Sequence, residues 1–176
     1  MKLIARALAW LLAIVVLLAG AFVLVGVFKP RVDYQIEVHV SADRPTVFAV
    51  YNNPERMGDW VEGFLGMENL SGQPNEVGSR WRLSFEHDRG GVMEVEEKVI
   101  AFRQDELFAF TADSDFATMD SRTRFEDAGN GTVIRVDAEL EGKGLIWRSM
   151  AVLSASMIRD RTERDLLRLK KLIEEG

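Results

Sequence analysis

The sequence has no cysteine and only two histidines among its 176 residues. Without cysteine, disulfides, thiolate metal sites and cysteine nucleophiles are all excluded. His39 and His87 are far apart, and the scattered carboxylates do not have the spacing of a metal site. A Ser-His-Asp triad and a phosphate-binding loop also have no signature in the sequence. The sequence therefore predicts no metal and no cofactor, and it assigns no catalytic residue.

Charge is absent from one long stretch near the N-terminus. From Ala7 to Phe28, "ALAWLLAIVVLLAGAFVLVGVF" is 22 residues without a charged side chain, which is enough to cross a bilayer core as a helix. The small triplet Ala19-Gly20-Ala21 is of the kind that signal peptidases cut, but the apolar run continues beyond it. We expect residues 1–31 to be an uncleaved transmembrane anchor with its junction. Cleavage at the triplet and a buried soluble helix are the alternatives.

The orientation of this span depends on the charges at its two ends. Lys2 and Arg6 precede it, and Lys29 and Arg31 follow it, so the positive-inside rule is nearly balanced. The very short N-terminal tail and its charges favour an N-in anchor. We therefore expect a single-pass membrane protein whose soluble domain lies on the periplasmic or extracytoplasmic side.

Basic residues are in the minority in the rest of the chain. Lys2 and Arg6 are two of the 22 Lys and Arg, so the part after the apolar segment has 20 basic against 28 acidic residues, a net charge of about −8. Such a surface repels phosphate, which argues against a nucleic-acid partner.

Apolar and polar residues alternate in several short segments, and this alternation predicts strands of an antiparallel sheet. In "VDYQIEVHV" every second residue from Val32 to Val40 is apolar. Ser41 or Asp43 is predicted to cap a short helix, and a second helical turn ends at Trp60. Further strands are predicted near 67–70, 80–87, 92–101, 107–112, 117–125 and 132–140, with His87 at a hairpin end.

The period of the apolar residues changes after Gly144. Ile146, Met150, Leu153 and Met157 are spaced 4, 3, 4, and helical spacing continues to Ile173, which predicts one amphipathic helix of about 30 residues. An antiparallel sheet cannot bury its apolar face alone, so this helix is its predicted cover. We expect an α+β domain over residues 32–176, in which a curved antiparallel sheet of about six to seven strands is closed by the helix and leaves a space between them.

Four stretches carry a resemblance to a known family. They are "VHVSADRPTVFAVYNNPERMGDW", "EVGSRWRLSF", "GNGTVIRVDAELEG" and "DLLRLKKLIE". In this order they resemble the START-like (SRPBCC) superfamily, in its polyketide cyclase/dehydrase-type branch, over about residues 32–175. The resemblance implies a helix-grip fold with an apolar cavity that binds lipids, sterols, quinones or polyketides. Some members are enzymes, but no catalytic set is common to the family, so none is carried over. The N-terminal anchor is an addition to the family pattern.

The candidate ligand-binding residues come from the inward positions of the strands and from the long helix. They are Trp81, Phe85, Met93, Val95, Glu97, Phe108, Phe110, Met119, Trp147, Met150 and Met157. Methionines and tryptophans at a sheet–helix boundary suit an adaptable pocket, although a filled core is the alternative. Glu97 occupies the apolar register between Val95 and Val99, so its carboxylate is predicted to face inward unless a bulge lets it reach water.

The sequence thus favours a membrane-anchored domain that binds a hydrophobic small molecule, of lipid or quinone type. A cyclase- or dehydrase-type enzyme and an accessory subunit of a larger membrane protein complex are the rival hypotheses. The predicted partners are the lipid bilayer, through residues 7–28, and the hydrophobic ligand; an integral-membrane protein partner stays open.

Overall fold

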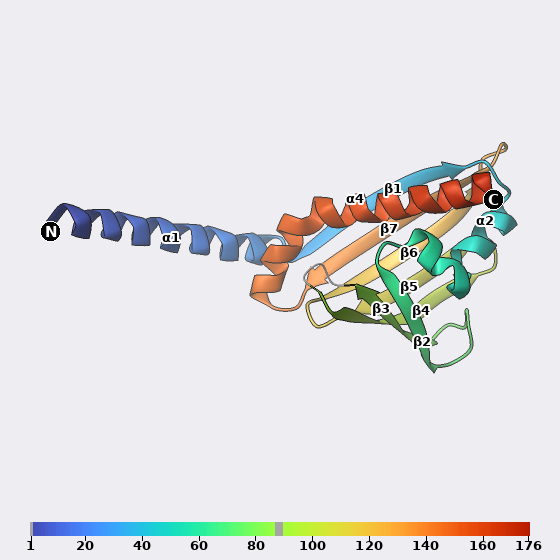
Figure 1. Cartoon of the computed structure of the whole chain (residues 1–176), viewed down its shortest axis with the longest axis horizontal. Helices are drawn as coiled ribbons and strands as arrows, with labels where there is room; N and C mark the ends of the chain where they lie inside the picture. Colours follow the sequence, from blue (N-terminus) through green and yellow to red (C-terminus); the bar gives the residue numbers. More distant parts are fainter. Residues whose placement is uncertain (1, 87–89) are drawn as a thin grey trace.

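The computed structural model of the chain describes residues 2–86 and 90–176. Helix α1 (Lys2–Phe28) extends away from a domain in which a seven-stranded antiparallel sheet is packed against the long helix α4 (Leu145–Glu175) (Figure 1). This is the predicted α+β helix-grip fold with one apolar helix before it. His87, which we expected at a hairpin end, lies outside the described residues.

The seven strands form a single sheet in which every pair of neighbouring strands is antiparallel. Its strands, in spatial order, are β1 (Arg31–Val40), β7 (Thr132–Gly142), β6 (Ala117–Asp127), β5 (Leu107–Asp113), β4 (Val92–Arg103), β3 (Arg80–Glu86) and β2 (Phe64–Ser71). Because β1 follows α1 almost directly, the antiparallel register puts Gly142 and Ala117 at the end of the sheet nearest α1. The opposite end carries Val40 and Thr132.

Strands β1 and β7 supply much of the core because both alternate strictly. Buried positions alternate with mostly exposed positions along β1 and with half-buried positions along β7, and buried residues face each other across the pair, as in Ile36 opposite Val136. The predicted strands are all present, with ends shifted by a few residues; β2 begins at Phe64 rather than near Met67.

The two short helices close the end of the sheet far from α1. Helix α2 (Arg44–Tyr51) is capped by Asp43, whose Oδ1 accepts the Thr46 N–H at 2.8 Å, and Pro45 lies in its first turn. The 3-10 turn η1 (Pro54–Arg56) and helix α3 (Met57–Trp60) follow. The core between these helices, the sheet and α4 includes Phe48, Trp60, Phe125, Leu166 and Leu169.

Helix α4 has the predicted length, but it presents a different face to the sheet. Ile146, Met150, Leu153 and Met157, which were expected to point inward, are 40–67% exposed. The inward positions of α4 include Ala151, Leu166 and Leu169, which lie at a different helical phase. The apolar stripe therefore lies on the outside of the domain.

Candidate ligand-binding cavity

A cavity of about 440 Å³ lies between the concave face of the sheet and α4. Every strand contributes to its wall, together with the end of α2, α3, the loop after β2 and the middle of α4 from Ile158 to Leu166. The lining is mainly apolar, and the volume falls within the range of small-molecule sites. The space predicted between sheet and helix is therefore present.

Seven of the eleven candidate residues line this cavity: Trp81, Phe85, Met93, Glu97, Phe108, Phe110 and Met119. All seven come from the central strands, where side chains alternate between the two faces of the sheet. This alternation along each strand was sufficient to predict them from the sequence.

The other four candidates do not line the cavity. Val95 is half-buried where β4 runs past the end of β5, since the β4–β5 pairing begins only at Glu96. Trp147, Met150 and Met157 are exposed, and their expected inward orientation is wrong. The residues of α4 that reach the cavity come later and are Ile158, Arg161, Thr162, Asp165 and Leu166.

Several lining residues were missed. Tyr34 and Val136 occupy inward positions of alternating strands, so alternation alone could have identified them. Arg161 and Asp165 had no such signal, because charged residues on a helix indicate a solvated face unless the neighbouring loop is known.

Glu97 lies on the inner face of the sheet, as the alternation predicted. The β3–β4 register is unbroken from Arg80 to Glu86, and it pairs Glu97 with Trp81. The Glu97 side chain is 8% exposed and lines the cavity. Burial raises its pKa from 4.5 to about 7, and no nearby cation or hydrogen-bond donor among the described residues offsets that effect.

Tyrosine hydroxyls provide further polar groups in the wall. The Tyr34 hydroxyl lies 3.4 Å from the Thr162 hydroxyl and 3.6 Å from the Met119 sulfur. The Tyr51 hydroxyl lies 2.9 Å from that of Thr123, and burial raises the pKa of Tyr51 to about 12. Both tyrosines are therefore neutral hydrogen-bonding groups at physiological pH.

One buried donor in the cavity wall lacks a protein acceptor. The indole Nε1 of Trp60 is buried and has no hydrogen-bond partner within the described ranges. Buried polar groups are normally paired, so a water molecule or a ligand acceptor is the expected partner.

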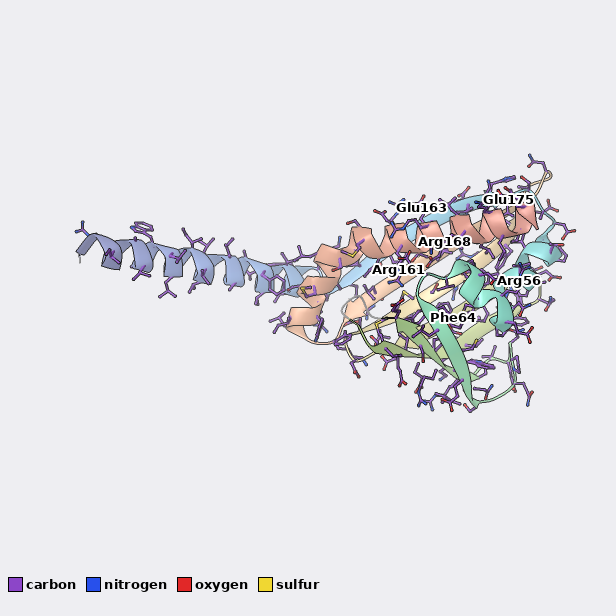
Figure 2. The ribbon with its side chains drawn as sticks, viewed as in Figure 1. Arg56, Phe64, Arg161, Glu163, Arg168 and Glu175 are labelled. Atoms are coloured by element: carbon purple, nitrogen blue, oxygen red, sulfur yellow. The ribbon has the colours of Figure 1, made fainter. Side chains whose placement is uncertain are left out.

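A polar network fastens one edge of the cavity. Arg161 Nη2 donates to the Glu62 carbonyl at 2.7 Å, and Asp165 Oδ1 accepts the Glu62 N–H at 3.1 Å. Arg168 Nη2 reaches the Glu62 carboxylate at 2.9 Å. Figure 2 shows Arg161 and Arg168 on the side of α4 that faces the short helices and Phe64, with Glu163 on the other side. These charges tie the loop after α3 to α4.

The sheet, the long helix and the cavity between them define a helix-grip domain. The chain belongs to the polyketide cyclase/dehydrase and lipid transport family, whose model matches residues 29–174. Comparison with curated proteins gave no match.

Solved structures agree on the fold. The structure of Ara h 8.0201 is similar over 83% of this chain and 99% of its own length, with 13% identity and a TM-score of 0.66. A protein of Thermus thermophilus is similar over 82% of this chain and 98% of its own, with 15% identity and a TM-score of 0.65. The di-domain ARO/CYC StfQ from the steffimycin biosynthetic pathway is similar over 84% of this chain and 52% of its own, with 9% identity and a TM-score of 0.70.

Proposed function

We propose that this protein is a membrane-anchored domain that binds a lipid- or quinone-like molecule in the cavity between the sheet and α4. The observation that carries the proposal is the cavity itself. It is large and mainly apolar, and its lining includes four methionines: Met57, Met67, Met93 and Met119. Flexible methionine side chains adapt to an apolar ligand without a fixed shape.

The anchor is supported by the length and exposure of α1. Within the 23 residues from Arg6 to Phe28, the most apolar 18-residue window has a mean hydropathy of 3.0, and only 6% of that window is buried within the protein. A helix of this length whose apolar surface is uncovered matches the thickness of a bilayer core. With Lys2 and Arg6 on the cytoplasmic side, the domain would lie outside the cytoplasm.

The position of the cavity supports exchange of ligand with the membrane. Met119 lies on β6 only two residues from Ala117, which is at the end of the sheet nearest α1. Phe85 and Met93 pair with each other beyond the end of β5, at this same end. The apolar lining therefore extends toward the anchor, which suits a ligand taken from the bilayer.

Glu97 is proposed to bind the polar end of that ligand. A carboxyl group with a pKa near 7 is partly protonated at physiological pH, so it can donate to a carbonyl or accept from a hydroxyl. The surrounding apolar wall would hold the remainder of the molecule.

An enzyme is the second candidate, and Glu97 is also the observation that favours it. A buried carboxyl that titrates near neutrality is suited to proton transfer, and the family includes cyclases and dehydrases. Glu97→Gln distinguishes the two roles. A carrier would retain its ligand with a modest change in affinity, whereas an enzyme that uses Glu97 as base would bind and lose turnover.

Filling the cavity tests the binding proposal. Ser121 is buried and lines the cavity, so Ser121→Leu adds volume there, while Ser121→Ala removes only the hydroxyl. Native mass spectrometry of full-length protein extracted in mild detergent should detect bound lipid or quinone in the wild type and in Ser121→Ala, and much less in Ser121→Leu.

A matched core variant gives the stability cost of overpacking with which the Ser121→Leu result is compared. Ala138 is buried but does not line the cavity, so Ala138→Leu should overpack the core and lower the free energy of unfolding by about 1–3 kcal/mol. Ser121→Leu should cost clearly less. If it costs as much, and no ligand is found on the wild type, the interior is a packed core and the proposal fails.

A further inference from the structure

We propose that the first half of α4, from Leu145 to Met157, is a second membrane contact, with its exposed apolar stripe immersed in the bilayer leaflet beside α1. This inference rests on the proposed anchoring by α1. It assigns a lipid partner to a surface that the cavity does not use.

The stripe is continuous and apolar. Ile146 and Leu153 are each 63% exposed, Met157 is 67% exposed and Met150 is 40% exposed. Their spacing of 4, 3, 4 places them on one side of the helix, and the run spans about 16 Å at 1.5 Å per residue. A stripe of this size in water would be unfavourable, and such surfaces normally mark an interaction site.

Contacts with α1 place this helix at the depth of the membrane. Ser149 is fully buried, and its Oγ donates to the Phe22 carbonyl at 2.6 Å and accepts the Gly26 N–H at 3.1 Å. Phe22 lies about 9 Å before the end of α1 at Phe28. A hydrocarbon core of about 30 Å requires about 20 residues, so nearly all of the 22 uncharged residues are needed to cross it. Phe22 therefore lies within the hydrocarbon, and Ser149 beside it is at the same depth.

The direction of the helix agrees with this placement. The first turns of α4 lie against the end of α1 and, in the view of Figure 1, run steeply across the direction of α1 before the helix continues along the sheet. A helix that crosses a membrane-spanning helix in this way lies along the membrane surface. Amphipathic helices bind that zone by burying their apolar face.

Aromatic side chains extend the same surface. Phe116, in the loop before β6, packs on Trp147 with ring centroids 4.6 Å apart, and both rings remain about 40% exposed. Tryptophan is enriched at the boundary between lipid and water. The loop and the start of α4 thus present one apolar edge.

Three cations near this edge, Lys143, Arg148 and Arg31, are paired with carboxylates. Lys143 pairs with Asp113 at 2.8 Å, and Arg148 pairs with Glu141 at 2.8 Å. Arg31 also pairs with Glu141, at 3.0 Å. The contact should therefore depend on apolar burial and should form on neutral phosphatidylcholine without anionic lipid.

Nitroxide accessibility tests this placement. Because the chain has no cysteine, a single introduced cysteine is the only labelling site. Ile146→Cys and Leu153→Cys report on the stripe, Leu17→Cys reports on α1, and the exposed Asp160→Cys is the matched control on α4. The full chain is placed in phosphatidylcholine nanodiscs at one chain per disc. Collisions are measured with oxygen, which concentrates in lipid, and with a nickel chelate, which stays in water.

We expect labels at positions 146 and 153 to resemble the label at 17, with oxygen-to-nickel collision ratios several-fold above that at 160. Nickel access at 146 and 153 with lipid exposure at 17 would overturn the inference and leave the anchor intact. Shielding of 146 and 153 from both reagents would overturn it in favour of a protein covering the stripe. Nickel access at 17 would refute the anchor, and this inference with it.

Discussion

Protonation of Glu97 couples the stability of this domain to pH. The pKa of Glu97 is about 7 in the folded protein against an ordinary 4.5, so between these values the folded state holds a proton that the unfolded chain has released. The resulting stabilisation is complete below pH 4.5 and is lost as the pH rises through 7. At 1.36 kcal/mol per pKa unit, the loss is up to about 3 kcal/mol.

Glu97→Gln stays neutral at every pH and should remove this loss. Urea unfolding of the ligand-free protein at pH 5 and pH 8 measures the free energy of unfolding of both proteins. The variant should be more stable relative to the wild type at pH 8 than at pH 5. Glu96→Gln is the control, because Glu96 lies on the other face of β4 and pairs with Arg80. If Glu97→Gln and the wild type lose stability in parallel between these pH values, the carboxylate reaches water or a cation.

Individual site residues were predictable where a strand controls their direction. Glu97, Trp81 and Phe110 were found from alternation, because successive side chains on a strand point to opposite faces. Arg161 and Asp165 could not be found in this way. Their inward role depends on Glu62, which is distant in the sequence and meets α4 only in the folded chain.

At the scale of elements, the packing of α1 on α4 depends on one glycine. A Cβ built on Gly26 would lie 2.5 Å from Ser149 Oγ and 2.8 Å from the Leu145 carbonyl oxygen, and part of this surface is backbone that cannot move aside. A Cβ on Gly20 would have nothing within 4 Å.

Gly26→Leu should therefore separate α1 from the start of α4, and Gly20→Leu should not. We expect the free energy of unfolding of the full chain in detergent to fall by about 1–3 kcal/mol for Gly26→Leu, the usual cost of overpacking. Tryptophan fluorescence during thermal unfolding measures the difference between the two variants. Equal stability of both variants would show that the two helices are not packed in the membrane-like environment.

The elements were easier to predict than their orientation. Strict alternation of apolar and polar residues was sufficient to predict β1 and β7, because this pattern is typical of a half-buried strand. For α4 the helical period was correct but its apolar stripe was assigned to the wrong side. Periodicity identifies an apolar face and does not say what covers it. In the folded chain, one face of α4 packs on the sheet, another contacts α1, and the apolar stripe faces away from the domain.

At the scale of the whole molecule, the uncleaved anchor can be tested against the signal-peptide alternative. Cleavage after Ala21 would leave a chain that begins at Phe22, yet Phe22 and Gly26 are hydrogen-bonded to Ser149 as part of the folded protein. We expect the full-length chain to stay in the membrane pellet after a carbonate wash, with an intact N-terminus by mass spectrometry. Protease added outside the cytoplasm should digest the domain.

A variant with charges in α1 tests whether the protein stays in the carbonate-washed membrane pellet because α1 is inserted in the bilayer. Ile14→Arg combined with Leu17→Arg places two charges near the middle of α1, each at an insertion cost of about 2.5–3.5 kcal/mol. Both positions are exposed and far from the contact with α4, so the fold of the domain should not change. The variant should shift to the carbonate supernatant. If it stays in the pellet together with the wild type, the membrane association comes from another part of the molecule, and the exposed start of α4 becomes the first surface to examine.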